Sequence, residues 1–80
     1  MEAAELLEYL ARGLVDQPDE VQVIETVEQD GTVVLELSVA QDDYGSVIGR
    51  GGRTAAALRT VVKAAAVKDK HRVFVDIIDD

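Results

Sequence analysis

The protein has 80 residues, of which 48% are apolar, so its length and composition predict one compact domain spanning residues 1–80 and argue against disorder. It has no cysteine, which excludes disulfides and thiolate metal sites. It has no apolar run near the roughly 18–20 residues of a membrane span, and its first residues are acidic where a signal peptide is basic, so the sequence predicts a soluble cytoplasmic protein. The net charge of −8, taken alone, argues against a nucleic-acid partner.

The first half of the chain predicts a helix followed by a β-hairpin. Apolar residues recur at three- and four-residue steps over residues 2–15, which predicts an amphipathic helix, and Pro18 cannot continue it. An Asp-Gly pair within residues 29–32 is typical of a hairpin turn. Apolar and polar residues alternate on both sides of that turn, which predicts strands over residues 20–28, with Val21, Val23 and Val27 on one face, and over residues 32–39.

The second half predicts two helices and a third strand. A short helix is expected over residues 41–48, a longer alanine-rich helix over residues 53–68, and a strand over residues 72–78. The resulting order is helix, strand, strand, helix, helix, strand. The fold class is therefore α+β, a three-stranded sheet with the helices packed on one face.

The charges are unevenly distributed along the chain. Residues 1–45 contain twelve acidic residues and one basic residue, whereas residues 46–72 contain seven basic residues and one acidic residue. Local potential, rather than net charge, steers a polyanion, so this basic stretch favours a negatively charged partner. The alternative is that the basic residues only solvate a helix.

Three glycines occur within residues 49–52, between the two predicted helices. Such a run suits a backbone that must closely approach a ligand, and the free N–H groups that begin the following helix suit a phosphate. A Walker loop requires Lys followed by Ser or Thr after its last glycine, but Arg53 and Thr54 follow here, and a dinucleotide-binding loop requires glycine where Thr54 stands. The GxxG loop of KH domains, which clamps about four nucleotides, remains.

Residues 47–53, with the sequence VIGRGGR, resemble the KH signature Val-Ile-Gly-x-x-Gly followed by Lys or Arg. The order of elements resembles the type II KH domain, and residues 14–21 (LVDQPDEV) and 58–66 (LRTVVKAAA) resemble the small bacterial KhpA family over the full length of the chain. The resemblance implies binding of single-stranded RNA, together with a larger KH-containing partner, KhpB, in post-transcriptional control linked to cell elongation and division. The expected RNA-binding residues are Val47, Ile48, Gly49, Arg50, Gly51, Gly52 and Arg53, extended along the next helix by Arg59 and Lys63.

Two features of this region leave alternatives open. Gly51 has no side chain where KH loops often have a polar or basic one, so Arg50 is the only charged side chain at the loop tip. Arg59 and Lys63 lie four residues apart on one helix face, where they extend the RNA-binding surface or only solvate the helix.

The helix over residues 53–68 has two apolar stripes. Leu58, Val62 and Ala65 form the stripe expected to face the sheet. The second stripe favours an interface with another chain, as a homodimer or a heterodimer with a KhpB-like protein, although alanine also simply favours helix formation. This second stripe consists of Ala57, Val61 and Ala64.

The remaining polar residues predict binding rather than catalysis. His71 is the only histidine and has no evident Ser or Cys partner, so we expect no enzyme activity, no cofactor and no small-molecule substrate. Asp42 and Asp43 are better explained by helix capping than by a metal. Tyr44 is the better of the two tyrosines for stacking on a base. The rival hypothesis is a protein-interaction module in which RNA binding is weak or incidental.

Overall fold

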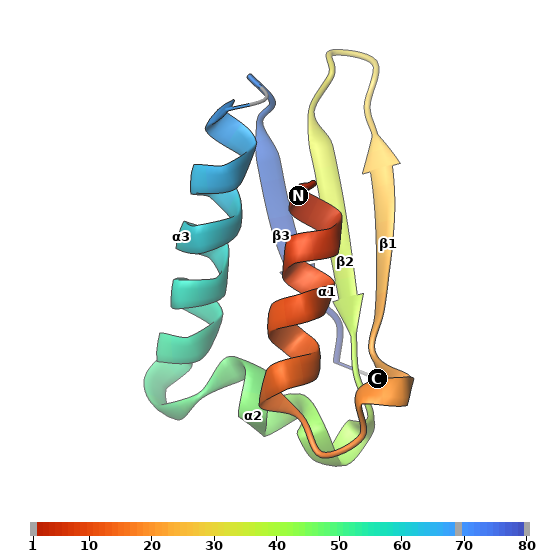
Figure 1. Ribbon diagram of the computed structural model, residues 1–80, viewed down its shortest axis with the longest axis vertical. Coiled ribbons are helices and arrows are strands. Elements are labelled where there is room, and N and C mark those ends of the chain that lie inside the picture. The colour runs from red at the N-terminus through yellow and green to blue at the C-terminus, as the bar shows by residue number, and fades with distance from the viewer. Residues whose placement is uncertain (1, 69, 80) are drawn as a thin grey trace.

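The computed structural model of the protein describes residues 2–68 and 70–79, and it has the predicted α+β architecture (Figure 1). Short 3-10 turns precede β1, α2 and α3, at Pro18–Glu20, Gln41–Asp43 and Arg50–Gly52. The elements occur in the predicted order: α1 (Ala3–Leu14), β1 (Gln22–Val27), β2 (Val33–Ser38), α2 (Tyr44–Ile48), α3 (Arg53–Lys68) and β3 (Val73–Ile77).

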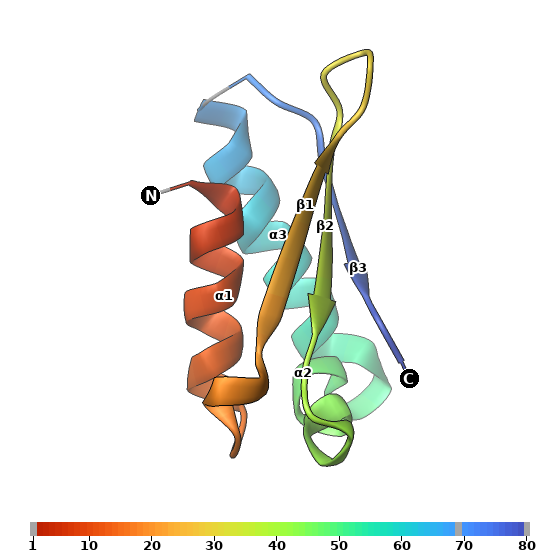
Figure 2. The same ribbon diagram turned by 90° about the vertical axis from the view of Figure 1, so that its right-hand side faces the viewer.

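The three strands form one mixed sheet in the order β1-β2-β3. β1 and β2 pair antiparallel, with Val27 opposite Val33, whereas β2 and β3 pair parallel, with Val34 opposite Phe74. Figure 2 shows the helices on one side of this sheet and the other side uncovered. The predicted two-layer arrangement is therefore confirmed. No helix within the described residues is long and apolar enough to cross a membrane.

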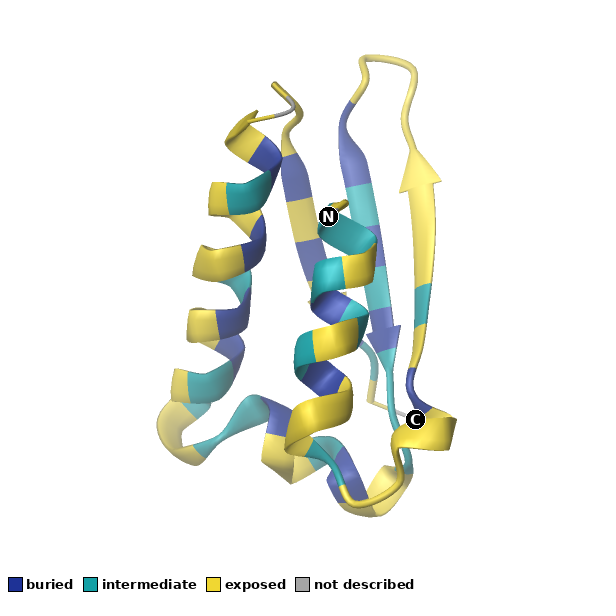
Figure 3. Cartoon of the chain, viewed as in Figure 1, coloured by how far each residue is buried: buried dark blue, intermediate teal, exposed yellow. Residues whose placement is uncertain are grey.

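The core lies between the helices and the covered face of the sheet (Figure 3). β2 alternates as predicted, because Val33, Leu35 and Leu37 are buried. α1 and α3 contribute the opposing layer of the core, which includes Leu7, Ala11, Ala55, Leu58, Val62 and Ala66. Ala65, expected in the buried stripe of α3, is only half-buried, and Ala66 is buried instead.

Val27 departs from the burial expected for β1. Val21 is buried and Val23 is half-buried, but the side chain of Val27 is 63% exposed. Val27 lies at the end of β1, where it borders an open cavity beside Ala3, the first residue of α1. The helix layer therefore does not cover this end of β1.

Asp43 has a role other than the predicted helix cap. It lies at the N-terminus of α2 and is buried, yet its carboxylate makes no capping hydrogen bond to that helix. Instead, its Oδ1 accepts a hydrogen bond from the N–H of Asp16 at 3.1 Å, and its Oδ2 accepts one from the N–H of Gln17 at 3.0 Å. Asp43 therefore fixes the end of α1 to the start of α2, which positions the glycine loop relative to the first helix.

Candidate nucleic-acid interface

The loop between α2 and α3 requires glycine at its first position. Gly49 ends α2 with φ 76° and ψ 171°, a combination that is essentially restricted to glycine. A Cβ atom at this position would lie 2.7 Å from Cβ and 2.8 Å from the backbone N of Thr54, and it would also clash with Oγ1. Gly49 thus allows α2 to end directly against the first turn of α3.

The tip of the loop is open on its outer side. Gly51 (φ 65°, ψ 18°) and Gly52 (φ 78°) also have left-handed backbones, but a Cβ atom on either would meet nothing within 4 Å. The side chains of Arg50 and Arg53 are exposed on both sides of this pair. The loop therefore combines a backbone that a ligand can approach with two guanidinium groups at the start of a helix.

Val47 and Ile48, both expected among the RNA-binding residues, lie in different environments. Ile48 is half-buried and packs at the margin of the core. Val47 is fully buried and belongs to the core, because α2 turns this side chain towards the sheet and α3. The prediction that Val47 contacts RNA is therefore corrected, and of these two side chains Ile48 is the one that is partly exposed at the loop.

Arg59 connects α3 to the outer edge of the sheet. Its Nε donates a hydrogen bond of 3.1 Å to the backbone carbonyl oxygen of Val75 in β3. β3 pairs with β2 on its other side, and the part of the chain that the structure describes places no strand on this outer edge. Arg59 therefore marks the middle of a surface formed by α3 and the free edge of β3.

Further along the same surface, two cations lie over an aromatic ring. The Nζ of Lys63 is 5.7 Å from the ring centroid of Phe74, and the guanidinium carbon of Arg72 is 5.9 Å from it. Sequence reasoning placed Lys63 here but missed Arg72 and Phe74. The alternation of β3 could have indicated that Phe74 points away from the core, but only the structure shows which helix lies next to its strand.

The second apolar stripe of α3 lies on another side of the helix. Ala57, Val61 and Ala64 are all exposed, as predicted, and Val61 retains 46% of its side-chain exposure. Together with α1, this region of α3 forms an almost wholly apolar groove of about 240 Å³. The residues that line the groove are Leu10, Leu14, Thr54, Ala57, Leu58 and Val61.

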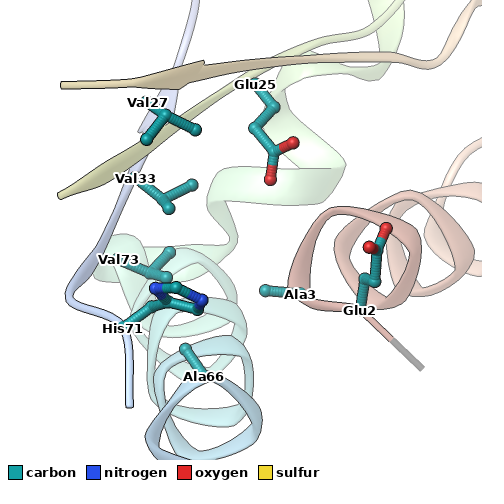
Figure 4. A pocket seen from close by; sticks show the side chains of 8 residues that line it. All are labelled: Glu2, Ala3, Glu25, Val27, Val33, Ala66, His71 and Val73. Atoms are coloured by element: carbon teal, nitrogen blue, oxygen red, sulfur yellow. The ribbon is translucent and has the colours of Figure 1, made fainter. Parts of the chain in front are cut away.

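A further hollow lies at the other end of the sheet from the glycine loop. It is an open cavity of about 450 Å³ between the start of α1, the end of β1 and the end of α3 (Figure 4). His71, Glu2 and Glu25 contribute its polar groups, and valines from all three strands contribute its apolar wall. Within residues 2–68 and 70–79, no group of three or more acidic, histidine or cysteine side chains is arranged to hold a metal ion.

A glycine loop that joins two helices, packed on a three-stranded sheet of this order and pairing, defines a KH domain. Residues 4–77 match the family model described as "KhpA/KhpB, KH domain". The chain belongs to this family.

Relatives of similar length confirm the family assignment. The chain is 58% identical over 74 residues to a protein of Clostridium acetobutylicum, an alignment that covers 92% of this chain and 97% of the relative. It is 57% identical over 75 residues to a protein of Halalkalibacterium halodurans (92% and 96% covered) and 49% identical over 77 residues to one of Leifsonia xyli subsp. xyli (96% and 97% covered). Each of these relatives is named "RNA-binding protein KhpA".

Proposed function

We propose that the protein binds short single-stranded RNA through the loop Gly49 to Gly52. The observation that best supports this proposal is the geometry of the loop. Its backbone at Gly49 has a conformation that is restricted to glycine, and its outer side is open between Arg50 and Arg53. The relatives described above are named RNA-binding proteins, which supports the same proposal.

The phosphate backbone of the RNA lies against the loop. Because Gly51 has no side chain and Gly52 meets nothing on its outer side, the backbone of the loop can come close to a sugar-phosphate chain. The first N–H groups of α3 point towards the same place, where the helix dipole favours negative charge. Arg50 and Arg53 add two full charges, which a phosphate-binding site needs in a protein of net charge −8.

The bases lie along the surface between α3 and β3. Ile48 offers apolar contact beside the loop, and Arg59 offers the remaining N–H groups of its guanidinium. The free edge of β3 presents backbone N–H and C=O groups, which can form hydrogen bonds with unpaired base edges. A duplex hides those base edges, so this arrangement favours single strands.

The acidic remainder of the chain limits binding elsewhere. Arg12, the one basic residue among the first 45, forms an ion pair of 2.8 Å with Glu8 on α1. Positive charge that is available to RNA is therefore concentrated on the loop, α3 and the start of β3.

The exposed stripe Ala57, Val61 and Ala64 is the proposed contact with a second KH domain, either another copy of this chain or a KhpB-like protein. Small side chains allow another helix to approach closely, and the adjoining groove along Leu10 and Leu14 extends the apolar area. One family model describes KH domains of both KhpA and KhpB, so a KhpB-like protein offers a related domain as the second partner. In the cell, this complex would act in post-transcriptional control linked to elongation and division.

A charge reversal at the loop tip tests the RNA-binding proposal. The double variant Arg50→Asp, Gly51→Asp should abolish binding of a fluorescent single-stranded RNA, measured by anisotropy. It should also keep its fold, because both residues are exposed and Asp tolerates the left-handed backbone of Gly51. The chain offers a matched control in the exposed pair Arg12→Asp, Gly13→Asp on α1, which changes the charge equally and should bind RNA normally.

The salt dependence of binding provides a second measure. If two to four phosphates are neutralised, a plot of log K against log salt concentration should have a slope of about −1.5 to −3, using about 0.7 per contact. Unchanged affinity in the folded loop variant, or binding that does not respond to salt, would contradict the proposal and favour the alternative, a dimerisation module in which RNA binding is incidental.

The proposed pairing is tested by sedimentation. Val61→Glu places a charge in the middle of the exposed stripe without reaching the core, so it should yield a monomer with a native circular dichroism spectrum and unchanged affinity for short RNA. Ile24→Glu, a similar change at an exposed residue of β1, is the control and should leave association intact. A wild-type protein that remains monomeric at high micromolar concentration excludes the homodimer.

A further inference from the structure

Phe74 is an apolar side chain left in solvent on a strand that otherwise buries its apolar residues. Val73, Val75 and Ile77 of β3 point into the core, whereas Phe74 alternates with them and remains 47% exposed. It is the only phenylalanine in the sequence. Its ring is therefore available to a flat ligand that approaches the outer edge of the sheet.

The two cations over this ring come from separate elements. Lys63 reaches from α3 and Arg72 from the segment before β3, so the ring and both charges form one cluster. Among the residues that the structure describes, no carboxylate forms an ion pair with either cation, and Asp30 in the hairpin turn is close enough to Arg72 for a weak electrostatic effect. The cluster therefore has positive charge left for an anionic ligand.

A hollow adjoins the cluster and has the composition of a base-binding site. It measures about 350 Å³, within the range of about 300–1,000 Å³ that is typical of small-molecule sites. Val67 and Val73 add apolar walls to the ring of Phe74, and His71 adds a further polar group. An aromatic face, apolar walls and two cations together match a nucleotide, with its flat base and its charged phosphate.

The distance from the glycine loop fits a continuous RNA strand. Ten residues of α3 separate Arg53 from Lys63, which corresponds to about 15 Å at 1.5 Å per residue. Four nucleotides, the number that a KH loop holds, span about 14 Å at the 3.4 Å spacing of a stacked strand. A strand anchored at the loop therefore brings its next nucleotide to Phe74, after passing Arg59.

We propose that Phe74, Lys63 and Arg72 form a stacking subsite for a nucleotide beyond the four held at the loop, a proposal that rests on the RNA binding proposed above. The base takes the place of Lys63 and Arg72 over the ring of Phe74 and stacks there, and the two displaced cations meet the phosphates beside it. Stacking on an aromatic ring tolerates any base, so the subsite extends the length of RNA that is bound rather than its sequence specificity.

The test compares oligoadenylates of four and eight nucleotides by fluorescence anisotropy. The eight-nucleotide RNA has five four-nucleotide registers, which alone give about 5-fold tighter binding; one stacked base should add a further gain of about 5- to 160-fold in the wild type. Phe74→Leu should lose most of this gain and bind the four-nucleotide RNA as the wild type does. The control Tyr9→Leu removes an exposed aromatic residue on α1, away from the cluster, and should keep the full gain.

A tryptophan variant supplies a direct readout, since the sequence contains no tryptophan. Phe74→Trp should restore the gain in affinity, and its emission should be quenched by the eight-nucleotide RNA and much less by the four-nucleotide RNA. Restoration by another aromatic residue separates stacking from a general packing effect.

The outcomes separate the two proposals. If the four-nucleotide RNA binds but Phe74→Leu keeps the further gain with length, or if the emission of Phe74→Trp does not change, the subsite is wrong and the loop proposal stands. A ring that instead contacts a protein partner would give this result. If the wild type binds neither RNA, both proposals are wrong.

Discussion

Replacing Gly49 with alanine should destabilise the protein far more than the same change at Gly51. At Gly49 the new Cβ would lie 2.7 Å from Cβ and 2.8 Å from the backbone N of Thr54, so the first turn of α3 would have to shift. The backbone of Gly49, at φ 76° and ψ 171°, is also essentially restricted to glycine. Backbone strain of about 1–3 kcal/mol and overpacking of about 1–3 kcal/mol together predict a loss of about 2–6 kcal/mol in the free energy of unfolding.

Gly51→Ala differs because its Cβ meets nothing within 4 Å. Only the left-handed backbone opposes it, at about 1–2 kcal/mol, and the reduced freedom of the unfolded chain offsets about 0.4–1 kcal/mol of that. Gly45→Ala, in α2 with no positive φ and open space around it, should stabilise the protein by about 0.5–1 kcal/mol. Urea unfolding followed by circular dichroism measures all three. If the losses for Gly49→Ala and Gly51→Ala agree within about 0.5 kcal/mol, the steric argument at Gly49 is refuted.

Three further predictions concern the ends of the elements. Asp43→Ala leaves two backbone N–H groups without their acceptor and should lower the free energy of unfolding by about 2–4 kcal/mol. Asp43→Asn keeps one acceptor oxygen and should lower the free energy of unfolding by less. Equal losses for the two variants in urea unfolding would contradict this prediction. Lys70 has a left-handed backbone (φ 59°) where α3 ends, so Lys70→Gly should stabilise the protein by about 1 kcal/mol and raise Tm by about 4–8 °C in calorimetry. Hydrogen bonds from the backbone and side chain of Thr32 lower the pKa of Asp30. The hairpin turn should therefore keep its full stability above the ordinary Asp pKa and lose that stability as the pH falls through the lowered pKa of Asp30. A Thr32 amide signal that titrates above about pH 4 in NMR would contradict this prediction.

Local sequence signals predicted the order and class of the elements because each signal acts within a few residues. Pro18 ends the first helical pattern, the Asp-Gly pair at residues 30–31 specifies the hairpin, and three glycines separate α2 from α3. Burial of individual residues was less predictable where it depends on how far one element covers another. Val27 has the alternation of a buried residue but lies where α1 does not cover β1.

The same distinction applies to the candidate site. The glycines and arginines of the loop are contiguous in sequence, so their motif was visible, whereas the burial of Val47 depends on the direction in which a five-residue helix meets the core. Asp43 joins residues 26 and 27 positions away, and no sequence periodicity indicates such a pairing. Phe74 acquires its cations only because β3 is an edge strand beside α3.

The proposed RNA-binding residues and the proposed dimer contact lie on different faces of α3. Residues two positions apart point about 200° away from each other at 3.6 residues per turn, so the stripe of Ala57 and Val61 lies nearly opposite Arg59 and Lys63. In the proposed dimer, the stripe is covered while the RNA-binding surface of each copy stays exposed. Two weak sites then lie on one particle, and an RNA long enough to reach both binds the second site at a high effective concentration. In that proposed dimer, a domain with a single charged side chain at its loop tip would hold long RNA more firmly than short RNA.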